Sequence, residues 1–270
     1  MTAHRQRFRD TARPQASAID PVSPATFLAE HKRIAVEGIR RYRRYERSVA
    51  TELAHSAAAH QAAAELAERH EAQAREQAEL DDWWEKVSQN DPETVLAALE
   101  RAFSDNEAPA LAVECAADAC TVVVLFWRLD AIPERRRDTT PTGRPTLKKR
   151  TKTERNEVYA ASLASHVLAT VRESFAVAPA LRTITVVALR PEDQSSDTAA
   201  AIYAGTFQRT QMEARAWERL DPLSTILQAD GAALQQKGRT SEVVPLSTEE
   251  VPELEALLSG VGEVVRIGNS

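Results

Sequence analysis

The sequence predicts an α+β protein: a long N-terminal helix, which is a candidate coiled coil, followed by a small α-β-β-α-β-β domain with a mainly antiparallel sheet. Alanine supplies 47 of the 270 residues and glycine only 8, which is typical of helix-rich chains and not of sandwiches with many tight turns. No proline stands between Pro24 and Pro92, so a helix can run through that stretch without a break. Four short apolar segments follow residue 109, and they predict strands.

Residues 1–22 are predicted to be a disordered basic tail. They carry four arginines among small polar residues and show no apolar period, so they bury too little apolar surface to order themselves. Ser23 is a good N-cap and Pro24 suits the first helical turn, so a helix is expected to begin there. The predicted segments are therefore a tail (1–22), a long helix or coiled coil (23–90) and a compact α+β domain (91–270).

The long helix has a heptad pattern that favours pairing, although the seam is weak. At 1.5 Å per residue, a helix over residues 24–87 would be about 95 Å long, which is more than the remaining chain can cover. Eleven of eighteen seam positions are apolar, and they are Leu28, Ala35, Tyr42, Tyr45, Val49, Ala59, Ala63, Leu66, Leu80, Trp84 and Val87. Three arrangements stay open: a coiled coil between chains, a helical hairpin within one chain, and a single solvated helix.

The compact domain is predicted to open with a helix after Asp91. The elements expected after it are strands over 110–115 and 120–127, a helix over 152–176, strands over 183–189 and 200–207, helical pieces over 211–220 and 222–229, a last helix over 246–258 and a strand over 263–267. Thr151 and Glu154 have capping-box spacing at the start of the second helix.

The two cysteines, Cys115 and Cys120, are predicted to face each other across a hairpin, because a turn-like stretch of four residues separates them. Since the cytosol keeps thiols reduced, we expect a reduced, half-buried pair, with a redox switch as the alternative. The longest apolar run, Thr121 to Trp127, is far shorter than the roughly 20 residues of a spanning helix, and no apolar core follows the basic N-terminus. The sequence therefore predicts a cytoplasmic protein without membrane contact.

Charge is segregated along the chain. The net charge is +6 for residues 1–47, −10 for 48–107, +4 for 108–152 and −6 for 153–270. Guanidinium groups mixed with aromatic rings can neutralise phosphates and stack on bases. The first basic patch is a candidate nucleic-acid surface of this kind, and it consists of Arg40, Arg41, Tyr42, Arg43, Arg44, Tyr45 and Arg47. Alternatively, the two tyrosines belong to the helix seam and the arginines are its solvated flanks.

A second basic patch lies in the proline-containing loop before the second helix of the compact domain. It is the best candidate for binding an anion or an anionic partner, and it consists of Arg135, Arg136, Arg137, Arg144, Lys148, Lys149, Arg150 and Lys152. The free N–H groups and the dipole at the following helix start also favour an anion. Because Pro141, Gly143 and Pro145 favour an irregular path, a solvated mobile loop without a fixed pocket is the alternative.

The familiar catalytic motifs are absent. The chain has no nucleophile elbow, no Walker phosphate loop and no dinucleotide-binding glycine motif. His55, His60 and His70 lie five and ten residues apart, which does not place two imidazoles on one helical face, so we expect no metal and no cofactor. His166 is expected to be a satisfied, partly buried histidine. A metal-dependent nuclease would need carboxylates and a lysine on adjacent strands, and the strands do not supply that set.

The stretch from Thr140 to Asn156, continuing through His166 and on to Pro179, resembles a domain of uncharacterised bacterial proteins. The resemblance covers about residues 92–209. It implies no activity and no catalytic residue.

Taken together, these patterns favour a non-enzymatic cytoplasmic interaction protein that forms a homo-oligomer through residues 23–90. Its basic loop would serve an anionic partner, either an unidentified protein or a nucleic acid. The alternative is a nucleic-acid-binding protein, with a metal-dependent nuclease as the less favoured extension.

Overall fold

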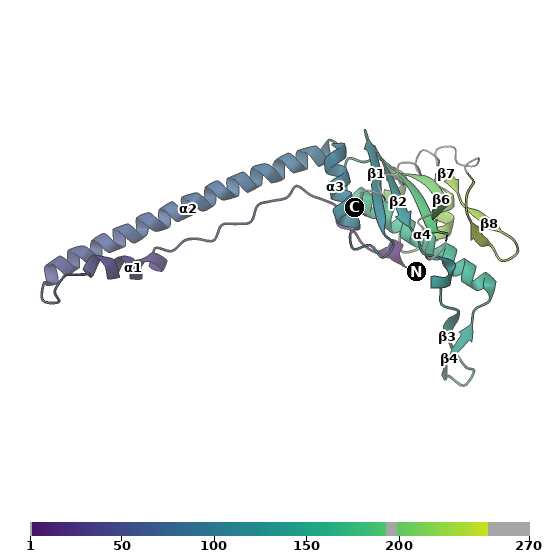
Figure 1. Cartoon of the computed structure of the whole chain (residues 1–270), viewed down its shortest axis with the longest axis horizontal. Coiled ribbons are helices and arrows are strands. Elements are labelled where there is room, and N and C mark those ends of the chain that lie inside the picture. The colour runs from purple at the N-terminus through teal and green to yellow at the C-terminus, as the bar shows by residue number, and fades with distance from the viewer. Residues whose placement is uncertain (1, 193–198, 248–270) are drawn as a thin grey trace. The chain divides into compact units, whose positions relative to one another are not determined.

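The computed structural model describes residues 2–192 and 199–247, which form two units (Figure 1). The helical unit comprises residues 13–85. The compact unit comprises the described residues of 1–12 and 86–270. Residues 2–12 therefore belong with the compact unit, although the sequence pattern places them in a separate tail.

Residues 23–90 form two helices and not one. Helix α1 runs over Ala25–Val36 and helix α2 over Arg44–Ser88. The break lies at Gly38, whose φ of +80° is a left-handed conformation that ends helices and that residues with a side chain rarely adopt. The prediction of one continuous helix was wrong, because a single glycine in a long alanine-rich stretch is a weak signal against the helix periodicity on either side.

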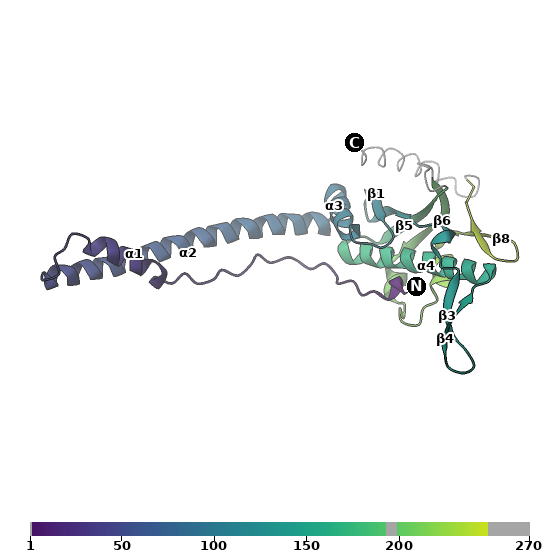
Figure 2. The same ribbon diagram turned by 60° about the horizontal axis from the view of Figure 1, so that its bottom comes forward.

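The helical unit is an antiparallel hairpin, with α1 lying beside α2 in both views (Figures 1 and 2). Buried alanines at a spacing of four form the contact face of α2, and they are Ala50, Ala54, Ala58 and Ala62. The His31 Nε2 and Gln61 Oε1 atoms lie 2.6 Å apart, and Arg47 Nη1 donates to Ile39 O over 3.1 Å. The second of the three predicted arrangements, a helical hairpin within one chain, is therefore present in the structure.

The extended chain before α1 continues along the same helix. Gln73 Nε2 donates to Ser17 O, and Arg13 pairs with Asp81 at 2.9 Å. The Arg13 guanidinium lowers the pKa of the Asp81 carboxyl by a hydrogen bond. This segment was predicted to be disordered from its composition, and its contacts in the structure are polar side chains on backbone atoms and one ion pair.

The compact unit is built on one five-stranded mixed sheet. Its strands are β1 (Ala110–Ala116), β2 (Ala119–Leu125), β5 (Thr183–Pro191), β6 (Ala199–Gln208) and β7 (Asp230–Ala233), in the order β1-β2-β5-β6-β7. Only β2 and β5 pair in parallel, because the chain crosses over between them through α4 (Lys152–Val177). A mixed α+β chain with a mainly antiparallel sheet is as predicted.

Several short elements follow β6 in the chain, and not all of them were predicted. They are α5 (Arg209–Glu213), α6 (Pro222–Leu227), β8 (Gln235–Lys237) and β9 (Glu242–Val244). Strands β8 and β9 form a separate hairpin. The helix expected over 246–258 and the strand expected over 263–267 lie outside the described residues from position 248 onward.

The core lies between the sheet and two helices, α3 (Pro92–Phe103) and α4. Most of α4 is buried, including Tyr159, Leu163 and Val167. The predicted capping box is confirmed, because Thr151 Oγ1 accepts from Glu154 N–H and the Glu154 carboxylate accepts from Thr151 N–H. This cap fixes where the chain leaves the preceding loop and enters the core.

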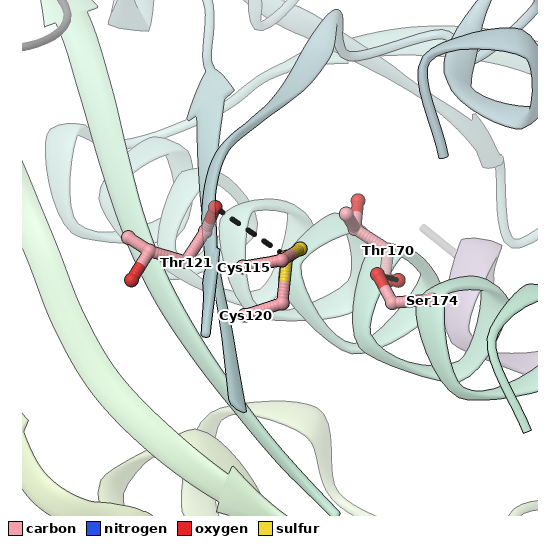
Figure 3. The surroundings of a disulfide bond; sticks show 5 residues. All are labelled: Cys115, Cys120, Thr121, Thr170 and Ser174. Carbon is pink, nitrogen blue, oxygen red and sulfur yellow. Dashed lines mark hydrogen bonds between the residues drawn. A yellow bond between two sulfur atoms is a disulfide. The ribbon is translucent and has the colours of Figure 1, made fainter. Parts of the chain in front are cut away.

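Cys115 and Cys120 are joined by a disulfide, so the expectation of a reduced pair was wrong for this structure. The antiparallel register of β1 and β2 places the two residues directly opposite each other, where Cβ atoms come within disulfide reach. Figure 3 shows the bridge beside Thr170 and Ser174 of α4. Both cysteines are buried in the core.

The N-terminal segment docks on α4 through the short 3₁₀ helix η1 (Ala3–Arg5). His4 is buried, its backbone N–H donates to Ser165 Oγ, and its Nδ1 lies 2.8 Å from the same oxygen. Further along, Thr11 N–H donates to Ala176 O. Burial, together with the nearby Arg5 and Arg172 charges, lowers the pKa of His4.

His4 should make stability depend on pH. Because its pKa is lowered in the folded state, the unfolded chain binds the proton more tightly, and the stabilisation is complete above about pH 6.5 and lost as the pH falls through the folded pKa. The wild-type protein should therefore lose its stability advantage over His4→Gln between pH 7.5 and 5.0, as measured by urea unfolding. An advantage that stays constant over this range would contradict the assignment.

Candidate functional site

The basic loop is an ordered β-hairpin, so the prediction of an irregular path was wrong. Strand β3 (Arg135–Thr139) pairs antiparallel with β4 (Pro145–Lys149), and the two form a sheet of their own. Gly143 has a φ of +80° in the turn, and Thr140 N–H donates to Arg144 O across it. We call residues 134–150 the basic arm (Figures 1 and 2).

The register sorts the cations of the basic arm onto two faces. Arg135 pairs with Lys149 and Arg137 with Leu147, whereas Arg136 pairs with Lys148. Residues directly opposite each other in a sheet share a face, and neighbours along a strand point to opposite faces. One face therefore carries three cations around Leu147, whose side chain is 60% exposed.

Three of the eight predicted cations already have partners within the chain. Arg136 lies 3.8 Å from Glu154, and Lys152 lies 2.7 Å from Glu242. Arg150 Nη1 donates to two backbone carbonyls, those of Pro133 and Arg135. Arg136 and Arg150 join the base of the arm to neighbouring segments, whereas Lys152 belongs to α4 and lies outside the arm.

The remaining five cations have no ion-pair partner within 4 Å in the described part of the chain, and they are Arg135, Arg137, Arg144, Lys148 and Lys149. All five are exposed. The arrangement can neutralise an extended anionic surface, with Arg144 at the turn and the Arg137–Leu147 pair half-way along the face.

The helix start beside the arm is not a free anion site. Glu154 occupies it, since its carboxylate accepts the Thr151 N–H over 2.7 Å. This backbone hydrogen bond lowers the pKa of Glu154, and the nearby Arg136 charge adds to the effect. The expected contribution of the α4 N-terminus to anion binding was therefore wrong, because the capping carboxylate is itself the anion.

The first basic patch lies at the bend of the helical unit. Arg40, Arg41 and Tyr42 belong to the connection between α1 and α2, and Arg44, Tyr45 and Arg47 to the first turn of α2. Arg43 pairs with Glu46 at 3.0 Å, and Arg40 Nη1 contacts the Tyr42 hydroxyl. The predicted residues therefore lie close together at the bend. Neither tyrosine is buried within the chain.

The histidines give no metal site among residues 2–192 and 199–247, where no group of three or more His, Cys, Asp or Glu side chains could hold a metal. His166 lies 2.9 Å from Ser162 O through Nδ1 and 3.2 Å from Glu107 Oε2 through Nε2. The prediction of a satisfied histidine is confirmed. Within the same described ranges, no helix is long and apolar enough to cross a membrane.

Comparison with known proteins gives no relative: no family model, no curated protein and no solved structure matches the chain. The resemblance of residues 92–209 to a domain of uncharacterised bacterial proteins stays a prediction.

Proposed function

We propose that the protein is a non-enzymatic interaction protein that pairs with a second copy through its helical hairpin and presents the basic arm to an anionic partner. The observation that carries the proposal is a stripe of exposed apolar side chains at the bend of the hairpin. Tyr45, Val49 and Leu53 follow one another at a spacing of four on α2, and they are 82%, 40% and 65% exposed. Large exposed apolar side chains that cluster in this way mark interaction surfaces.

The stripe lies on a different face of α2 from the one that packs on α1. The buried alanines begin at Ala50, one residue after Val49, which is a rotation of about 100° around the helix. Tyr45 and Val49 are also seam positions of the predicted coiled coil. The second copy would thus use seam residues that the hairpin leaves exposed.

Charge complementarity favours a second copy in the antiparallel orientation. Residues 37–47 at the bend contain five arginines and two glutamates, whereas residues 64–85 contain eight acidic and two basic side chains. An antiparallel pair places each bend against the acidic half of the other α2. Such an arrangement brings opposite charges together at each bend, and a parallel pair sets like charges against each other.

Replacing two stripe residues with glutamate should abolish self-association. Val49→Glu with Leu53→Glu places charges in the proposed contact while touching no residue buried within the chain, so helix content should be unchanged by circular dichroism. Sedimentation velocity should show a single copy at concentrations where the wild type forms two.

A matched control uses the same stretch of α2. Ser48→Glu with His55→Glu adds two acidic groups at exposed positions seven residues apart, away from the stripe. It should associate like the wild type. Equal loss of association in both double variants would show that added negative charge, and not the apolar stripe, decides the outcome.

Nucleic-acid binding is the second candidate function, and the shape of the basic arm favours it. A two-stranded ribbon fits the major groove of DNA, and the arm presents Arg135, Arg137 and Lys149 on one face of such a ribbon. The chain as a whole is acidic, with a formal net charge of −6. Any binding must therefore come from local basic patches, of which the arm is one, and should weaken steeply with salt.

Removing two cations from the arm should weaken binding to duplex DNA about tenfold or more at roughly 50 mM salt. The variant is Arg137→Ser with Lys149→Ser, chosen because neither side chain has an ion-pair partner in the described chain. Lys237→Ser with Arg239→Ser removes the same charge from the β8–β9 hairpin and should bind like the wild type. If a mobility-shift assay detects no wild-type binding to DNA or RNA at this salt, the anionic partner is not a nucleic acid.

Cytoplasmic localisation remains part of the proposal, and thiols are held reduced in that compartment. The antiparallel register of β1 and β2 runs from Ala110–Val124 to Ala116–Ala119, so backbone hydrogen bonds along the hairpin would hold the two strands together in the dithiol. The surface of the arm would thus be the same for the dithiol and the disulfide.

A further inference from the structure

A pocket with a volume of about 380 Å³ lies in the compact unit, where the N-terminal segment and the loop between α5 and α6 meet α4. Four arginines and one tryptophan dominate its walls, and they are Arg5, Arg7, Arg172, Arg219 and Trp217. The pocket shares no residue with the basic arm. Its volume is near the lower end for small-molecule sites, which suits a discrete ligand and not an extended polymer.

Arg172 is held in a fixed position within this pocket. Its Nη1 donates to the carbonyls of His4 and Gln6 over 2.7 and 2.8 Å, and its Cζ lies 4.2 Å from the centre of the Trp217 ring. Among the described residues, no group accepts a hydrogen bond from its Nε or Nη2. A guanidinium positioned in advance loses little conformational entropy on binding a ligand.

The pocket carries more positive charge than its own carboxylate balances. Arg7 pairs with Glu218 at 3.3 Å, but both side chains are exposed, and such pairs contribute little. Arg5 and Arg219 have no ion-pair partner within 4 Å among the described residues. Burial and the Arg7 charge lower the pKa of Arg172, which is the direction expected where cations are crowded.

We propose that this pocket binds a phosphate group, either as the free ion or at the end of a small molecule. Guanidinium groups bind phosphate oxygens through paired N–H donors, and a dianion would offset most of the excess charge. The indole of Trp217 offers an apolar wall to the rest of an esterified ligand. Arg172 belongs to α4, and the two other segments that supply arginines contact this helix, so the site exists before the ligand arrives.

Titration calorimetry of the full-length protein with ribose 5-phosphate, inorganic phosphate and ribose tests the proposal. The two phosphates should bind saturably at about 50 mM salt, where charge attraction is least screened, and ribose should not bind. Tighter binding of ribose 5-phosphate would identify an ester as the ligand, and equal affinity would identify the free ion. In either case, Arg5→Gln and Arg219→Gln should each weaken binding about tenfold.

Arg9→Gln is the matched control, because it removes one exposed cation from the same N-terminal segment without touching the pocket wall. Its affinity should stay within about twofold of the wild type, as expected for a charge that makes no direct contact. An affinity in Arg5→Gln and in Arg219→Gln that stays within twofold of the wild type would overturn the proposal. The absence of saturable binding of both phosphates to the wild type would overturn it as well.

Discussion

Arg209→Ala is expected to lower the free energy of unfolding of the compact unit by about 3 kcal/mol or more. Arg209 follows β6 and donates to three backbone carbonyls: Nη2 bonds Phe175 O and Ala178 O, and Nε bonds Leu181 O. Two of these acceptors are at the C-terminal end of α4, where carbonyls lack helical partners and a cation is favoured by the helix dipole. The guanidinium also lies 4.7 Å above the Phe175 ring.

Two further variants separate these contributions in urea unfolding followed by circular dichroism. Arg209→Lys keeps the charge but cannot reach three acceptors in the same plane, so it should recover less than half of the loss. Arg182→Ala removes an exposed arginine that lies 3.7 Å from Asp118, and it should cost no more than about 0.5 kcal/mol. An Arg209→Ala protein as stable as the wild type would show that water replaces all three bonds.

Gly205→Ala is expected to destabilise the sheet by about 2 to 3 kcal/mol. A Cβ at position 205 would come within 2.9 Å of the Tyr203 Cζ, and it would also overlap the Tyr203 hydroxyl. Tyr203 cannot move away easily, because it is fully buried and its hydroxyl donates to Ile226 O over 3.0 Å. Burial also raises the pKa of Tyr203.

The clash at Gly205 can be tested by removing the atom that causes it. Tyr203→Phe alone should cost about 1 kcal/mol, because Ile226 O loses its partner. In the double variant the hydroxyl is gone, so the two losses should be less than additive. Strict additivity in chemical unfolding would place the cost of Gly205→Ala elsewhere, for instance in backbone conformation.

The parts of the fold that the sequence predicts are those with local, periodic signals. The Thr151–Glu154 capping box marks the start of α4, and the spacing of Cys115 and Cys120 marks the β1–β2 hairpin. Gly38 is present in the sequence, but whether it ends the helix depends on whether α1 can pack on a face of α2. That face consists of alanines, whose small side chains give no strong pattern.

The basic arm shows why its strands could not be predicted. Strand β3 reads Arg-Arg-Arg-Asp-Thr and β4 reads Pro-Thr-Leu-Lys-Lys, so neither alternates polar with apolar residues, and the arm packs on no core that would require alternation. The pocket proposed to bind phosphate was missed for another reason. Arg5, Arg172 and Arg219 come from three distant segments, and only the docking of η1 and the α5–α6 loop on α4 brings them together.

Light scattering of the full-length protein tests the central claim most directly. The account predicts two copies of the 29.8 kDa chain at micromolar concentration and about 0.1 M salt, held by the apolar stripe and the complementary charges of α2. A mass of one chain at every concentration would contradict pairing through the helical hairpin, and with it the proposed function.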